Sequence, residues 1–211
     1  MKKTDIHLHL TFEQHPKTEH MFVSSAEHML PHLRELSIEK GILMSSGEGN
    51  SAVPFGSNDE CRQIAEAFPG IYFWMCNLDD VPKNIFERLE TYKNQGAVGI
   101  GELMINRSID DPMIQEIFAA AETLSLPVLF HMSPEVGYEY GIVDDAGLPL
   151  LEESLKKYPN LKFIGHSQPF WHEISGDASG DLSSRMEWGK GEVAPGGRLS
   201  YLFDTYPNLY G

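Results

Sequence analysis

The chain has 211 residues, of which 41% are hydrophobic, and this length is enough for one sizeable hydrophobic core. Its formal net charge is −15 with histidine neutral, and it has no run of lysine or arginine, so nucleic acid and anionic membranes are disfavoured as partners. Cys61 and Cys76 are the only cysteines and form no CxxC pair, which excludes a cysteine zinc site.

The N-terminus passes directly into the first predicted strand, residues 5–10, with the sequence DIHLHL. No apolar segment of a signal peptide precedes it, and no apolar run in the chain is long enough to span a membrane, so we expect a cytoplasmic protein. Residues two apart share a face of a strand, so His7 and His9 point one way while Ile6 and Leu8 point the other. The histidines therefore face either water or a polar pocket.

Further predicted strands alternate with amphipathic helical segments along the rest of the chain. Capping boxes at Ser24 and Ser57 and the pair Asp111-Pro112 mark the starts of three helices. The Gly-, Ser- and Asp-containing segment 168–195 is expected to be a lid, a specificity loop or simply disordered. The remaining predicted strands are 41–47, 71–78, 97–103, 127–133, 161–167 and 209–211. Such an alternation predicts a parallel sheet covered by helices.

Polar residues end four of these strands, which decides between an open sheet and a closed barrel. They are His7 and His9 on the first strand, Glu102 on the fourth, His131 on the fifth and His166 on the sixth. In a barrel these strand ends converge on one mouth, whereas in an open sheet they spread along a line. We therefore predict an α/β, TIM-barrel-like (β/α)8 fold forming a single domain over residues 1–211.

In such a barrel, the aliphatic side chains of the first strand pack on helices and the histidines line the site. The eighth strand is absent from the sequence. We therefore expect either that the chain is a fragment of a longer one, truncated at the C-terminus, or that its barrel is open or completed by a partner.

The histidines are candidate metal ligands, because neutral imidazole binds Zn²⁺ and other borderline divalent ions. An HxH pair alone is a weak signal and fits a solvated strand face equally well, and His131 or His166 alone fits a packed histidine. Four histidines closing three strands favour a metal site. Glu102 is a ligand, a bridge between two ions or a general base, or else an acid that caps the next helix or meets a lysine.

Histidines elsewhere carry a weaker signal. His28 and His32 lie four residues apart on one helix face, but they lack the acid of an HExxH motif, so we expect a solvated helix face. Trp171 and His172 follow the sixth strand, and we predict that they contact substrate, with a packed loop as the alternative.

Five segments, in order, resemble the amidohydrolase-related metal-dependent hydrolases, the "amidohydrolase 2" branch of the amidohydrolase superfamily. They are DIHLHL, GIGEL, LFHMSP, FIGHSQPFW and GGRLSYLFDTYPNLYG, and the resemblance covers residues 5–211. It implies a distorted (β/α)8 barrel with a divalent metal at the strand ends. His7, His9 and His131 would be ligands, His166 a ligand or the catalytic acid/base, and Glu102 a bridging carboxylate.

The resemblance also implies an aspartate at the end of strand eight that acts as ligand and proton acceptor. No position of this chain matches it, because Asp204 lies in a predicted helix and Asp177 and Asp181 lie in the segment 168–195. This departure motivates a non-enzymatic alternative, a barrel that binds a ligand or metal without turnover.

The favoured hypothesis is metal-assisted hydrolysis by a metal-activated water, acting on a small molecule with an amide, ester or lactone, or with a carboxylate-bearing ring. His166 would donate or accept a proton, or stabilise the developing oxyanion. Zinc is the expected metal, with manganese or iron as alternatives. Non-oxidative decarboxylation is a second enzymatic reading, and a metal-dependent deoxyribonuclease is disfavoured by the net charge of −15. The expected partner is a small-molecule substrate, without nucleic acid or membrane, and a homo-oligomer is an open prediction.

Overall fold

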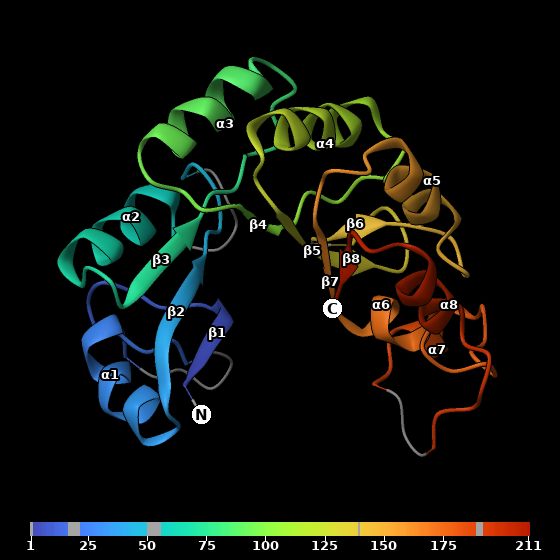
Figure 1. Ribbon diagram of the computed structural model, residues 1–211, viewed down its shortest axis with the longest axis horizontal. Helices are drawn as coiled ribbons and strands as arrows, with labels where there is room; N and C mark the ends of the chain where they lie inside the picture. The colour runs from blue at the N-terminus through green and yellow to red at the C-terminus, as the bar shows by residue number, and fades with distance from the viewer. Residues whose placement is uncertain (1, 17–21, 50–55, 139, 189–191) are drawn as a thin grey trace. The chain divides into compact units, whose positions relative to one another are not determined.

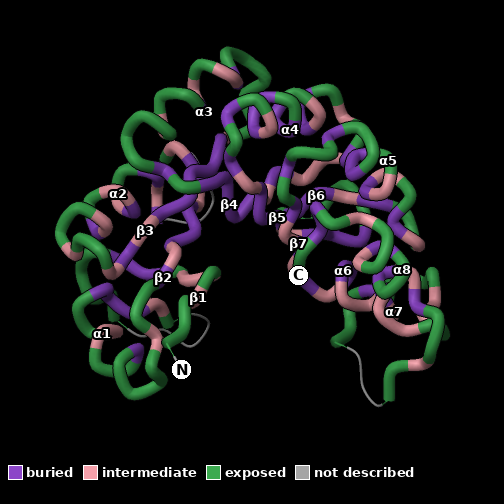
Figure 2. Tube along the Cα trace, viewed as in Figure 1, coloured by how far each residue is buried: buried purple, intermediate pink, exposed green. Residues whose placement is uncertain are grey.

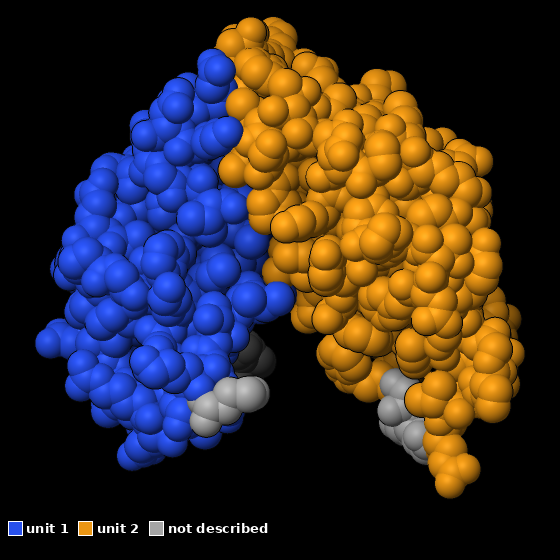
Figure 3. Space-filling view, viewed as in Figure 1, with its two compact units in different colours: residues 1–81, 90–102 blue, residues 82–89, 103–211 orange. Residues whose placement is uncertain are grey.

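The computed structural model describes residues 2–16, 22–49, 56–138, 140–188 and 192–211, in which strands and helices alternate (Figure 1). The chain divides into two compact units, coloured separately in Figure 3. Unit 1 contains residues 1–81 and 90–102, and unit 2 contains residues 82–89 and 103–211. The division passes through helix α3 (Ile85–Asn94) and strand β4 (Ile100–Leu103).

Unit 1 is built on a three-stranded parallel sheet in the order β1-β2-β3. Its strands and connecting helices are β1 (Lys3–Leu8), α1 (Ala26–Glu35), β2 (Ile38–Met44), α2 (Asn58–Ala67) and β3 (Tyr72–Met75). Leu43, Ile64 and Trp74 are buried and form part of its core. The hydroxyl of the buried Tyr72 donates to the carbonyl of Ala26 at 2.8 Å, which satisfies the polar atom of a ring packed among apolar side chains.

Both helices of unit 1 begin at a serine, one at the predicted position and one a residue later. Ser57 Oγ accepts the N–H of Glu60 at 3.3 Å, which is the serine half of the predicted capping box, whereas the carboxylate of Glu60 accepts the N–H of Gly56, one residue before the cap, at 2.6 Å. The cap of α1 is Ser25 and not Ser24, which corrects the prediction. The reason is that Ser25 still forms a parallel bridge with Thr11, so the chain stays extended through Ser24 and turns helical only afterwards.

Strand β1 is the most exposed strand of unit 1, as Figure 2 shows by its green and pink residues. Leu10, just beyond it, is buried, but Ile6 is 43% exposed. The expectation that Ile6 packs on helices is therefore wrong within the described part of the chain. The pairing of β1 with β2 is irregular between Asp5 and Leu8, so the strict inward and outward alternation does not hold along this strand.

Unit 2 contains a parallel sheet in the order β5-β7-β8, with β6 paired to β5. Its strands are β5 (Val128–Ser133), β6 (Ile142–Val143), β7 (Phe163–His166) and β8 (Leu209–Tyr210). Its helices are α4 (Pro112–Leu124), α5 (Pro149–Lys157), α6 (Gln168–His172), α7 (Leu182–Arg185) and α8 (Arg198–Thr205). Asp111 caps α4 as predicted, because its Oδ1 accepts the N–H of Met113 at 2.8 Å.

Aromatic rings fill the core of unit 2 on the face of the sheet opposite the histidines. Phe130 and Phe170 meet edge to face with ring centroids 5.9 Å apart. Gly165 of β7 is what admits the Phe170 ring, since a Cβ at this position would come within 2.2 Å of it. A side chain larger than hydrogen at position 165 would therefore displace Phe170 from the sheet.

Seven strands correspond to the predicted segments, and the described strand pairs are parallel. Strand β6 was not predicted, and the segment 168–195 contains the short helices α6 and α7. None of the helices formed by the described residues is long and apolar enough to cross a membrane. The single domain predicted for residues 1–211 stays a prediction.

Candidate metal centre

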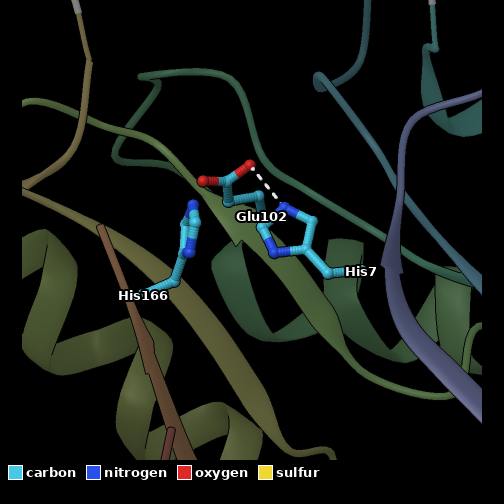
Figure 4. A group of neighbouring side chains, drawn as sticks. All are labelled: His7, Glu102 and His166. Atoms are coloured by element: carbon cyan, nitrogen blue, oxygen red, sulfur yellow. Dashed lines mark hydrogen bonds and ion pairs between the residues drawn. The ribbon is translucent and has the colours of Figure 1, made fainter. Parts of the chain in front are cut away.

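In unit 1, the two N-terminal histidines meet the carboxylate of Glu102. His7 lies in β1, His9 follows the end of that strand, and Glu102 lies in β4. The Nε2 atoms of His7 and His9 are 3.1 Å apart, and each is 3.2 Å from Oε2 of Glu102. Figure 4 shows the His7 imidazole beside this carboxylate. The prediction that the two histidines share a face is confirmed.

The three side chains differ in their exposure to solvent. The side chain of Glu102 is 5% exposed, that of His7 is 23% exposed, and that of His9 is 44% exposed. The buried member of the group is therefore the carboxylate, which is costly to bury unless a cation or hydrogen-bond donors compensate its charge. The partly exposed imidazoles leave the group accessible from solvent.

The spacing of the donor atoms fits one divalent ion. Zinc lies about 2.0–2.2 Å from histidine nitrogen and carboxylate oxygen, and two such ligands at a tetrahedral angle are about 3.3 Å apart. The three separations of 3.1, 3.2 and 3.2 Å are close to this value. Two neutral imidazoles and one carboxylate are also a donor set that Zn²⁺, Mn²⁺ and Fe²⁺ accept.

In unit 2, the other two predicted histidines lie side by side on neighbouring parallel strands. His131 of β5 is the register partner of His166 of β7, and their ring centroids are 5.3 Å apart. Leu129 and Ile164, two residues earlier on the same faces, are also register partners. Both imidazoles are half-buried, so each remains accessible for proton transfer or metal binding.

Tyr140 is a neighbour of this histidine pair that the sequence analysis did not identify. Its ring centroid is 4.7 Å from that of His131, and its backbone carbonyl accepts a hydrogen bond from Ser133 Oγ. Tyr140 is 43% exposed, so the residue is accessible from solvent. Its only sequence signal is its position seven residues after the end of β5, which does not by itself indicate a site residue.

Trp171 and His172, predicted to contact substrate, both lie in helix α6 and both make contacts within unit 2. His172 Nε2 is 2.8 Å from the carbonyl oxygen of Ser179, which ties the following loop to the helix. The Trp171 ring packs against Phe170 and Phe203, with centroids 5.3 and 6.2 Å away. These contacts explain the local packing, and substrate binding by the two residues stays a prediction.

The chain was also compared with known proteins. A family model described as "Amidohydrolase" matches residues 4–191. Comparison with curated proteins found no match. Among solved structures, the chain is similar to an uncharacterized TIM-barrel protein from Bordetella bronchiseptica, with a TM-score of 0.62 and 17% identity, over 100% of this chain and 74% of that one.

Two further solved structures are similar to the chain. A probable 2-pyrone-4,6-dicarboxylic acid hydrolase from Acinetobacter baumannii has a TM-score of 0.52 and 18% identity, over 82% of this chain and 60% of that one. A 5-carboxyvanillate decarboxylase from Novosphingobium aromaticivorans, with bound manganese, has a TM-score of 0.54 and 14% identity, over 81% of this chain and 68% of that one. The chain thus spans less than two thirds of the hydrolase's length, and these likenesses confirm the predicted TIM-barrel-like fold.

Proposed function

The chain belongs to the amidohydrolase family, and on this basis we propose that it is a metal-dependent hydrolase of a small-molecule amide, ester or lactone. The spacing of His7, His9 and Glu102 in unit 1 is the observation that carries the proposal. Three donor atoms separated by 3.1 to 3.2 Å suit a single divalent ion. The net charge of these three ligands, −1 with neutral imidazoles, leaves such a site cationic when it is loaded.

His131 and His166 complete the proposed ligand set, with His166 also the proposed catalytic acid/base. Their support is the position of both residues at strand ends, their pairing in unit 2 and the resemblance of their segments to the family. An imidazole takes up or releases a proton near neutral pH, which suits His166 for moving a proton at a ring nitrogen. Zinc is the proposed metal, and the manganese bound to the similar decarboxylase supports manganese as the alternative.

A bound divalent ion would polarise a substrate carbonyl and lower the pKa of a coordinated water towards about 7. The residues of this chain have separate tasks. Glu102 would hold negative charge beside the imidazoles, so that His7 and His9 stay oriented with Nε2 towards the site. His166 would accept or donate the proton, and the half-exposed ring of Tyr140 would border the ligand beside His131.

Non-oxidative decarboxylation is the second candidate reaction, because one similar structure is a 5-carboxyvanillate decarboxylase. The similar hydrolase and the similar decarboxylase act, by their names, on compounds that carry carboxyl groups. We therefore propose a small substrate with a carboxylate on a ring for either reaction. Release of carbon dioxide identifies the decarboxylase, whereas ring opening or amide cleavage without carbon dioxide identifies the hydrolase. The cytoplasmic location and the homo-oligomer stay predictions.

The metal content of purified protein tests the proposal. The variant His7→Ala/His9→Ala removes two of the three clustered donors and should lose most of the zinc or manganese that elemental analysis finds in the wild type. The matched control is His28→Ala/His32→Ala, which removes two exposed imidazoles from α1, where their ring centroids are 5.7 Å apart. Metal content that is unchanged in the first variant would refute the proposed site.

A further inference from the structure

Two buried asparagines hold the strand end that carries Glu102. Asn58 and Asn77 are 3% and 2% exposed and lie within unit 1. The side chain of Asn77 uses both ends of its amide: Nδ2 donates to the carbonyl of Glu102 at 2.7 Å, and Oδ1 accepts the N–H of Leu78 at 2.9 Å. Asn77 therefore connects the end of β3 to the residue that bears the proposed metal ligand.

Asn58, the first residue of α2, fixes Asn77 in turn. Its Nδ2 donates to the carbonyl of Asn77 at 2.8 Å, and its Oδ1 accepts the N–H of Asn77 at 2.9 Å. An amide side chain that pairs with both backbone groups of one residue reproduces the hydrogen bonds of a neighbouring strand. The result is a continuous chain of hydrogen bonds from α2 through the end of β3 to the carbonyl of Glu102.

The peptide group on the other side of Glu102 is also held. The carbonyl of Gly101 accepts the N–H of Ser45 at 2.9 Å, just beyond the end of β2. Both carbonyls that flank the Cα atom of Glu102 are therefore fixed, one by a backbone donor and the other by Asn77. Because the orientation of the two flanking peptide groups sets the direction of the Cα–Cβ bond, these hydrogen bonds aim the carboxylate.

The direction in which the Glu102 carboxylate points is critical to the proposed metal site. Its Oε2 lies 3.2 Å from Nε2 of both His7 and His9, while the side chain is 5% exposed. A metal site needs its ligand distances kept within about 0.2 Å. Since Glu102 sits in the four-residue strand β4, a small backbone shift would carry the carboxylate away from the imidazoles.

We propose that Asn58 and Asn77 are positioning residues that set the geometry of the metal ligand Glu102 through its backbone, without touching the ion. This inference rests on the proposed metal-dependent function. Residues that orient metal ligands usually change metal affinity about 10- to 100-fold when they are removed. The Asn58–Asn77 pair differs from such side-chain partners only in acting on the main chain of the ligand.

The matched control comes from another buried asparagine in this chain. Asn208 is 7% exposed, and its Nδ2 donates to the carbonyls of Leu155 and Tyr158 at 3.2 and 3.1 Å, within unit 2. Asn77→Ala and Asn208→Ala thus remove the same amide from buried, carbonyl-bonded positions. A purely structural role predicts that both variants lower the melting temperature and leave metal affinity alone.

The experiment titrates metal-free variants of the 211-residue chain with Co²⁺ and follows the visible absorption spectrum of the bound ion, which reports the ligand geometry. Asn77→Ala should bind Co²⁺ about 10- to 100-fold more weakly, with an altered spectrum, while Asn208→Ala keeps the wild-type affinity and spectrum. In the background of Glu102→Gln, Asn77→Ala should cause no further loss, because the two residues act on one interaction. If Asn77→Ala does not fold, Asn58→Ala should show the same change of affinity and spectrum.

The outcomes separate the two proposals. Co²⁺ binding by the wild type that is unchanged in Asn77→Ala and Asn58→Ala would refute the positioning role and leave the metal site standing. A loss in Asn77→Ala that adds fully to that of Glu102→Gln would also refute it, because the residues would then act independently. Failure of the wild type to bind Co²⁺ or any other divalent ion would refute the proposed function itself.

Discussion

Replacing Asp144 by asparagine should remove a pH-dependent loss of stability from unit 2. Asp144 is 1% exposed and precedes helix α5. Its carboxylate accepts the N–H groups of Asp145, Leu150 and Leu151 at 2.8, 3.1 and 2.8 Å. Burial raises the pKa of this carboxyl from 3.8 to about 6, since the lost hydration outweighs the three N–H donors, and the charge of Asp145 adds to the rise.

The sign of the effect follows from the direction of the shift. A carboxyl with a higher pKa in the folded state holds its proton more tightly there than in the unfolded state. Its contribution to stability is therefore full below pH 3.8 and is lost as the pH rises to about 6. At 1.36 kcal/mol per pKa unit, a shift from 3.8 to about 6 corresponds to about 3 kcal/mol.

Urea unfolding at pH values from about 4 to about 8 measures this contribution. Relative to the wild type, the free energy of unfolding of Asp144→Asn should rise by roughly 2–3 kcal/mol across this range, because the asparagine cannot ionise. The control is Asp145→Asn, which removes an exposed charge from the same turn and should change stability by no more than about 0.5 kcal/mol. If the free energy of unfolding of Asp144→Asn relative to the wild type stays constant or falls as the pH rises, the three N–H donors outweigh the burial of Asp144.

Three further predictions concern packing, capping and the cysteines. Gly165→Ala should lower stability by about 1–3 kcal/mol in urea unfolding, because the added Cβ would meet the Phe170 ring at 2.2 Å; an unchanged midpoint would contradict this packing. Ser57→Ala should lower the free energy of unfolding by about 1 kcal/mol through loss of the α2 cap, whereas Ser57→Thr should lower it by less. Burial raises the pKa of the Cys61 and Cys76 thiols to about 12, so iodoacetamide at pH 8 should label neither in the native protein and both in urea, as mass spectrometry can check.

Features that depend on neighbouring residues could be predicted from the sequence. The side chains of His7 and His9 were expected to point the same way, and their Nε2 atoms are 3.1 Å apart, although the pairing of β1 is irregular between Asp5 and Leu8 and His9 follows the end of that strand. The caps at Ser57 and Asp111 were predictable because a cap bonds to a backbone N–H two or three residues later. The cap of α1 was misplaced by one residue because the bridge between Ser25 and Thr11 spans a stretch of chain that local spacing does not describe.

Features that depend on distant residues could not be predicted. Strand β6 has only two residues, and it is a strand because Ile142 and Val143 pair with the end of β5. Asn77 follows a strand, where asparagine usually indicates a turn. Its side chain instead bonds to Glu102, 25 residues later, and its backbone bonds to Asn58, 19 residues earlier. A single sequence contains no signal for such pairings, so the hydrogen bonds that connect Asn58, Asn77 and Glu102 are evident only in the folded structure.

The register of β5 with β7 couples the packing on the apolar side of this sheet to the positions of the histidines on its other side. Phe130 is opposite Gly165, and His131 is opposite His166, so consecutive residues project to opposite sides. In this alignment Phe170 packs over Gly165 and against Phe130. A shift of the two strands by one residue would lose this aromatic contact and also separate the rings of His131 and His166, so a misaligned chain would be less stable and would lack the histidine pair of the proposed site.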